Sequence, residues 1–93
     1  MPILQIEHRV RDYDAWKRAF DSDPVGRSQG GVRKHRIVRG VDDPNLVAIE
    51  LEFDQAEAAE SFRGALEQLW GRVGAELGLE NRQVRIVETM ETS

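Results

Sequence analysis

The alternation of apolar and polar residues is clearest over residues 46–53, Leu-Val-Ala-Ile-Glu-Leu-Glu-Phe. In a pleated strand, every second residue from Val47 to Phe53 points to one fully apolar face, while the other face carries Glu50 and Glu52. Helices should cover the apolar face. The mixed face should meet water or another protein, because a buried carboxylate needs a partner for its charge.

The same patterns predict five further elements, which are a strand over residues 3–10, a helix over 12–23 capped by Asp12, a strand over 32–39, a helix over 54–78 and a strand over 83–90. Pro24 and the stretch 26–31 should form the connection after the first helix, and 40–45 is short enough to predict a hairpin.

Two of these elements have unusual compositions. The strand over 32–39 is strongly basic, which is typical of an edge strand that must resist pairing with other chains. The second helix has a capping-box spacing in Asp54 and Glu57 and should end at Gly78, but glycines interrupt it. We therefore expect two helical pieces or a kink near Gly64.

The order strand, helix, strand, strand, helix, strand is that of an α+β, ferredoxin-like βαββαβ domain. Its sheet should be four-stranded and antiparallel, with both helices on one face. Right-handed crossovers should place the first strand centrally, beside the strand over 46–53 and the last strand.

Composition limits the class of protein. Ninety-three residues predict a single domain, 1–93, and 13 basic against 17 acidic residues disfavour nucleic acid or an anionic membrane as a partner. The absence of cysteine excludes a disulfide framework and thiol catalysis, and the first residues do not resemble a signal peptide. We expect a cytoplasmic protein.

The mixed face of the predicted sheet suggests self-association. Its charged residues carry both signs in similar number, and they are Glu7, Arg9, Lys34, Arg36, Glu50, Glu52 and Arg85. Solvation alone could account for them. The apolar residues among them favour burial against a second copy of the sheet, and these are Ile3, Leu46, Ala48 and Val87.

Most of the chain resembles the dimeric α/β barrel superfamily, which includes antibiotic-biosynthesis monooxygenases and small actinobacterial cyclase-like proteins. The resemblance rests on Val10-Arg11-Asp12-Tyr13-Asp14-Ala15-Trp16, on the block 31–39, on Asp42-Asp43-Pro44-Asn45-Leu46-Val47, and on Leu51-Glu52-Phe53-Asp54 with Glu57-Ala58-Ala59. It implies a homodimer whose two sheets form a barrel, with a pocket in each subunit between sheet and helices.

Candidate site residues follow from that implied pocket. It would be lined by His8, Tyr13, Trp16, Phe20, Phe62 and Trp70, with His35 nearby if its strand turns it inward. Aromatic walls with one or two imidazoles suit a flat aromatic or apolar small molecule. His8 is the candidate proton acceptor, because imidazole changes charge near neutral pH. The alternative is that His8 and the aromatic residues are ordinary core residues.

Other classes of site fit the sequence less well. His8, His35 and Glu50 are the residue types of a two-histidine, one-carboxylate metal site, but alternation places Glu50 on the opposite face from His8, so we expect no metal. The central strands lack the exposed aromatic residues of RNA-binding domains, and the stretch 26–31 does not match a phosphate-binding loop.

Two hypotheses of different class therefore stay open. The first is a cofactor-independent monooxygenase-like or cyclase-like enzyme acting on an aromatic or polyketide-like molecule, with His8 assisting the substrate's own carbanion chemistry. The second is a non-catalytic dimer that binds a ligand or takes part in a larger assembly.

Overall fold

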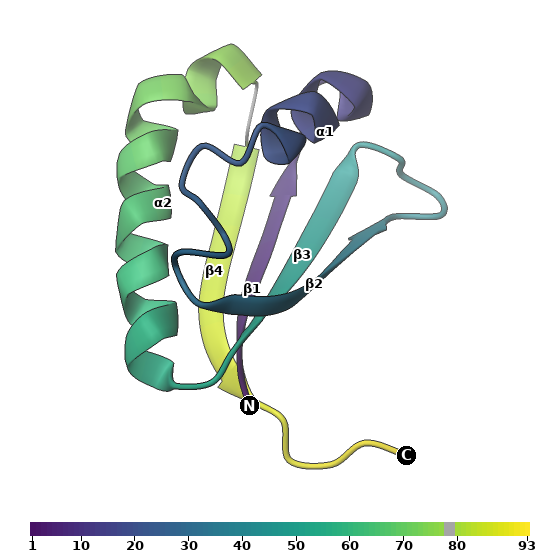
Figure 1. Cartoon of the computed structure of the whole chain (residues 1–93). Coiled ribbons are helices and arrows are strands. Elements are labelled where there is room, and N and C mark those ends of the chain that lie inside the picture. Colours follow the sequence, from purple (N-terminus) through teal and green to yellow (C-terminus); the bar gives the residue numbers. More distant parts are fainter. Residues whose placement is uncertain (78–79) are drawn as a thin grey trace.

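The computed structural model describes residues 1–77 and 80–93, and its elements follow the predicted order (Figure 1). They are β1 (Pro2–Arg9), α1 (Tyr13–Asp21), β2 (Val32–Arg39), β3 (Leu46–Phe53), α2 (Ala56–Leu77) and β4 (Glu80–Glu88). The strands form an antiparallel sheet in the order β2-β3-β1-β4. The ferredoxin-like fold is thus confirmed, with β1 central between β3 and β4.

The register of the strands explains which side chains form the core. Ile6 of β1 lies opposite Ile49 of β3 and Val84 of β4, and Ile49 in turn lies opposite Ile37 of β2. Because alternate residues share a face, this row and its neighbours two residues away point to the helices. Leu4, Ile6 and Ile49 are buried there, and Ile49 belongs to the apolar face that alternation predicted.

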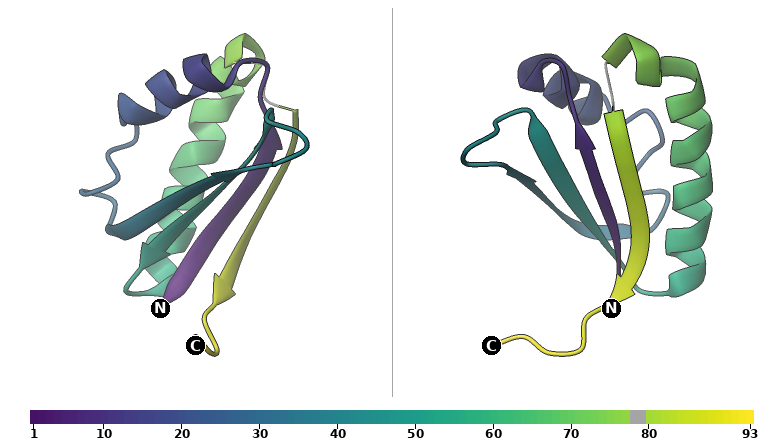
Figure 2. Two further views of the ribbon diagram at one scale, coloured as in Figure 1. Left: turned by 90° about the vertical axis from the view of Figure 1, so that its right-hand side faces the viewer. Right: turned by 180° about the vertical axis from the view of Figure 1, so that it is seen from behind.

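The two helices lie on the same side of the sheet (Figures 1 and 2). α2 packs against β1, β3 and β4, while α1 lies beyond the end of β1 and contributes Trp16 to the same core. The segment 22–31, which we call the 22–31 loop, runs from the end of α1 to the start of β2 on this side of the sheet (Figure 1). This arrangement leaves space between the loop, the helices and the sheet.

α1 begins as predicted and ends two residues earlier than predicted. The Asp12 side chain accepts a hydrogen bond from the backbone N–H of Asp14, which is the expected N-cap. At the other end, the Ser22 hydroxyl donates to the carbonyl of Ala19, and Asp23 adopts a left-handed backbone conformation with φ of 55°. A left-handed residue cannot continue a right-handed helix, so the chain turns there.

Two predictions about α2 are wrong. The helix begins at Ala56, and the Asp54 carboxylate accepts a hydrogen bond from Arg33 at 2.8 Å instead of capping the helix. The helix is also continuous past Gly64 and Gly71, which lie on its exposed side. A missing side chain on the exposed side creates no gap in the core, so it gives no cause for a kink. The predicted cap at Gly78 lies outside the described residues.

The outer face of the sheet, turned away from the helices, carries a row of hydrogen-bonded polar side chains that crosses all four strands. Arg85 of β4 donates to Gln5 of β1 at 3.2 Å, Gln5 donates to Glu50 of β3 at 3.2 Å, and Arg36 of β2 donates to Glu50 at 2.8 Å. We call these four residues the polar row. Arg36 and Glu50 form an ion pair, and Gln5 links Glu50 to Arg85, so the row is hydrogen-bonded throughout and carries one net positive charge.

The ends of the sheet complete the description. β4 runs from Glu80 to Glu88, three residues ahead of the predicted start and two short of the predicted end, and the segment after it extends away from the sheet (Figure 1). Among the described residues, the helices are too short or too polar to cross a membrane.

Candidate functional site

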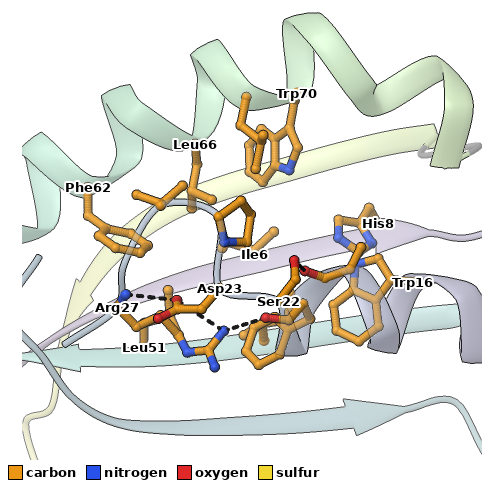
Figure 3. A pocket seen from close by; sticks show the side chains of 16 residues that line it. Ile6, His8, Trp16, Ser22, Asp23, Arg27, Leu51, Phe62, Leu66 and Trp70 are labelled. Carbon is orange, nitrogen blue, oxygen red and sulfur yellow. Dashed lines mark hydrogen bonds and ion pairs between the residues drawn. The ribbon is translucent and has the colours of Figure 1, made fainter. Parts of the chain in front are cut away.

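A cavity of about 330 Å³ lies between the helix-facing side of the sheet, the two helices and the 22–31 loop (Figure 3). It is lined by Ile6, His8, Trp16, Ala19, Phe20, Ser22, Asp23, Pro24, Val25, Arg27, Ile49, Leu51, Phe62, Leu66, Leu69 and Trp70. Its size falls within the range of about 300 to 1,000 Å³ that is usual for small-molecule sites. Most of these residues are apolar, and only His8, Asp23 and Arg27 can carry a charge.

His8 is the polar residue at the inner wall of the cavity. Strand alternation turns it toward the helices, where only 1% of its surface is exposed, and its ring meets the edge of Trp16 at 5.7 Å between centroids. Its Nδ1 atom is buried and has no hydrogen-bond partner among the described residues. A buried polar atom without a partner is rare in native proteins, and a polar group of a bound ligand would supply the partner that Nδ1 lacks.

The surroundings of His8 favour the neutral imidazole. Burial lowers the pKa of His8 below its ordinary value of 6.5, because the protonated form loses hydration. A contact with the residue's own backbone raises the pKa in part, and the positive charge of Arg82 makes a smaller lowering contribution. At neutral pH the ring therefore keeps a lone pair that can accept a proton or a hydrogen bond.

Aromatic side chains from both helices form the walls of the cavity. Trp16 and Phe20 of α1 stack with their ring centroids 5.4 Å apart. Phe62 of α2 packs against Phe53 of the sheet at 5.7 Å, and Trp70 lies further along α2 (Figure 3). Flat aromatic surfaces on two sides suit the stacking of a planar ligand.

Two candidate residues do not line the cavity. Tyr13 lies in the first turn of α1, where the guanidinium of Arg39 stands 4.3 Å from the centre of its ring. His35 lies on the edge strand β2, which does turn it toward the helices, and its ring centroid is 5.4 Å from that of Phe20, but the residue is exposed. The cavity therefore contains one histidine rather than two.

The 22–31 loop supplies Ser22, Asp23, Pro24, Val25 and Arg27 to the cavity, and none of these five was predicted as a site residue from the sequence. Arg27 is the most strongly anchored of them. Its Nη1 donates to the carbonyl of Phe20 at 2.8 Å, and its backbone N–H donates to the Asp23 carboxylate at 2.8 Å. The four-residue spacing of Asp23 and Arg27, next to Pro24, was the available signal of a structured turn.

No grouping suitable for a metal ion is present in the described part of the chain, where no three histidine or acidic side chains come together. Glu50, the carboxylate considered with His8 and His35, points to the outer face and belongs to the polar row.

Comparison with solved structures identifies proteins of the same fold. SnoaB, a cofactor-independent oxygenase from Streptomyces nogalater, is 16% identical, with a TM-score of 0.73 over 98% of this chain and 94% of SnoaB. A proposed antibiotic biosynthesis monooxygenase from Nitrosomonas europaea is 18% identical, with a TM-score of 0.73 over 98% of this chain and all of the other. A dimeric ferredoxin-like protein from an uncultured marine organism is 13% identical, with a TM-score of 0.67 over 99% of this chain and 96% of the other.

These TM-scores show a shared ferredoxin-like fold, which is the fold that the resemblance implied. Searches of protein-family models and of curated proteins gave no match.

Proposed function

We propose that the protein binds a flat, largely apolar aromatic or polyketide-like molecule in the cavity between sheet and helices, and that it acts on this molecule as a cofactor-independent monooxygenase-like or cyclase-like enzyme. The observation that carries the proposal is His8, whose buried Nδ1 has no described partner in a cavity lined by Trp16, Phe20, Phe62 and Trp70. The oxygenase name of SnoaB, a protein of the same fold, supports this choice of chemistry.

His8 would act as the general base. The neutral imidazole accepts a proton from an acidic C–H or O–H group of the substrate, which leaves the electron pair on the substrate as a carbanion or enolate. Molecular oxygen is then the oxidant. One of its atoms is transferred to the carbon, converting a CH₂ group to a carbonyl, and the other leaves as water with the two hydrogens. In a cyclase, the same carbanion would instead attack a carbonyl of the substrate.

The cavity would favour this proton transfer in two ways. Its apolar walls exclude water, so the imidazolium and the substrate anion attract each other more strongly than they would in solution. The aromatic side chains would hold the substrate flat, with its reacting atom next to the imidazole.

The test uses the two tryptophans, Trp16 and Trp70, which both line the cavity. A planar hydroxylated compound such as 1,3-dihydroxynaphthalene should quench their fluorescence, and an oxygen electrode shows whether oxygen is consumed. His8→Ala should weaken binding by about 1 to 3 kcal/mol or stop turnover, with an unchanged fold.

His35→Ala is the matched control, because His35 is the only other histidine and lies outside the cavity lining. If His8→Ala loses much of its stability and no compound of an aromatic panel changes the fluorescence of the parent, His8 is a core residue and the proposal fails.

The second candidate is a non-catalytic ligand-binding or assembly dimer. It is favoured by the isolation of His8, since no carboxylate among the described residues bonds to the imidazole to orient it as in a catalytic triad. Saturable binding without oxygen uptake or chemical change of the ligand would support this alternative.

We further propose that two copies associate through the outer faces of their sheets. The polar row joins its members by hydrogen bonds and pairs Arg36 with Glu50, and Ile3, Leu46, Ala48 and Val87 add apolar surface beside it. The protein of the same fold from an uncultured marine organism is named a dimeric ferredoxin-like protein, which is consistent with self-association.

Light scattering should give about twice the chain mass of 10.6 kDa. Ala48→Arg should reduce this to the monomer mass without unfolding the protein. A strict monomer at tens of micromolar parent protein would contradict the association.

A further inference from the structure

We propose that Arg27 determines ligand specificity by binding an acidic oxygen of the ligand, such as a carboxylate or an enolate, at the end of the cavity away from His8. This inference rests on the proposed ligand site and adds the chemical class of the ligand. The ligand is an elongated planar aromatic molecule with a neutral oxygen at His8 and an anionic oxygen at Arg27.

One wall of the cavity connects the two polar ends. The guanidinium carbon of Arg27 lies 4.0 Å from the centre of the Phe20 ring, Phe20 stacks on Trp16 at 5.4 Å, and Trp16 meets His8 at 5.7 Å. These four residues therefore form a continuous row, with a cation at one end and a neutral imidazole at the other. Figure 3 shows His8 and Trp16 side by side and Arg27 further along the cavity. The rings cover one another's faces, so a planar ligand that lies along their edges can contact both ends.

The guanidinium of Arg27 is anchored but not fully used. Only 21% of its side chain is exposed, and Nη1 is held by the carbonyl of Phe20 at 2.8 Å. Among the described residues, Nη2 and Nε have no hydrogen-bond acceptor. A guanidinium has five N–H donors, so several can bind an oxygen of a ligand.

Asp23 does not satisfy this charge by itself. Its Oδ1 accepts a hydrogen bond from the backbone N–H of Arg27 at 2.8 Å, whereas the guanidinium Nη1 is 3.6 Å away, which is beyond hydrogen-bonding distance. The Asp23 carboxylate thus fixes the turn of the loop. It also forms an ion pair with the guanidinium at this end of the cavity, but it accepts no hydrogen bond from it. The donors on Nη2 and Nε are therefore left for an acidic oxygen of a ligand, and a charge-assisted hydrogen bond in these mostly apolar surroundings is strong.

Arg27 also has a structural role, since its Nη1 satisfies a carbonyl in the last turn of α1. The experiment must separate this role from ligand binding. Isothermal titration calorimetry at pH 7.5 and low salt with 2-naphthoic acid and 2-naphthamide does so, because the two probes share shape and differ in charge. The parent should bind the acid about tenfold more tightly than the amide.

Arg27→Gln should abolish this preference while keeping the affinity for the amide, since glutamine retains a donor for the Phe20 carbonyl. Arg18→Gln is the matched control, because it removes an exposed positive charge in the last turn of α1, and Arg18 does not line the cavity. It should keep the preference.

Equal affinities of the parent for both probes, or an unchanged preference in Arg27→Gln, would overturn the role of Arg27 while leaving the proposed site intact. Failure of the parent to bind either probe would overturn both. Should Arg27→Gln fail to fold, the salt dependence of the parent decides the question. Binding of the acid must weaken from 20 mM to 500 mM NaCl while binding of the amide does not.

Discussion

Adding one methyl group to a glycine should have opposite effects at different places in this chain. Gly30 lies in the 22–31 loop, where an added Cβ would stand 2.5 Å from Cδ1 and 2.8 Å from Cε1 of Phe62. At Gly64 and Gly71, on the exposed side of α2, a Cβ would meet nothing within 4 Å. The same substitution, glycine to alanine, therefore tests packing at one site and helix propensity at the other two.

The expected magnitudes follow from these surroundings. Phe62 is buried against Phe53 and cannot move away freely, so Gly30→Ala should cost about 1 to 3 kcal/mol, as overpacked cores do. Gly64→Ala and Gly71→Ala should each stabilise the protein by about 0.5 to 1 kcal/mol, since alanine loses less conformational entropy in a helix. For a domain of this size, about 1 kcal/mol shifts the melting temperature by about 4 to 8 °C.

Urea unfolding followed by circular dichroism measures all three variants. Gly30→Ala should also weaken binding of planar ligands, because the displaced Phe62 ring lines the cavity. An unchanged or raised midpoint for Gly30→Ala would refute the close approach of the loop to α2. A loss of stability in Gly64→Ala would refute the continuous, exposed course of the helix and restore the kink that the sequence suggested.

Two further predictions test the burial of β1 and β3. Burial lowers the pKa of His8, so below about pH 6.5 the unfolded state takes up a proton that the folded state does not. The contribution of His8 to stability should therefore be complete above that pH and should fall as the pH decreases toward the folded-state pKa. This loss should be smaller in His8→Gln, and the same dependence of the urea midpoint on pH in both proteins would contradict the buried imidazole. Ile49→Asp places a carboxylate among buried apolar residues, so it should lower the free energy of unfolding by several kcal/mol, out of a total of about 5 to 15 kcal/mol. Glu91→Ala, in the exposed C-terminal segment, should change nothing measurable. Cooperative unfolding of Ile49→Asp at the parent midpoint would show that the faces of β3 are assigned wrongly.

Strand positions could be predicted from the sequence because alternation directly records which side of a strand is buried. Val47, Ile49, Leu51 and Phe53 were assigned to one apolar face on that basis, and all four are buried. The start of α2 could not be predicted in the same way. Asp54 has the composition of a cap, but its carboxylate pairs with Arg33 of a neighbouring strand, and such a long-range contact leaves no local pattern.

The cavity was harder to predict than the fold. His8, Trp16, Phe20, Phe62 and Trp70 were found because strand and helix periodicity orient them inward. The lining residues of the 22–31 loop follow no period, since each is placed by turns and by the left-handed conformations of Asp23 and two glycines. Tyr13 and His35 share the inward faces of their elements but lie toward the edges, a position that periodicity alone does not specify.

The central place of β1 in the sheet determines the order in which the protein can fold. Pro2 pairs with Glu88 on one side, and Ile3 pairs with Glu52 on the other, so both neighbours of the first strand come from far along the chain. Only the β2–β3 hairpin joins strands that are close in sequence. Closing large loops is slow, so this hairpin should form early and β1 should be completed last, in milliseconds to seconds rather than microseconds. During synthesis, the hydrogen-bonding groups on one edge of β1 must therefore stay without their strand partner until β4 has emerged.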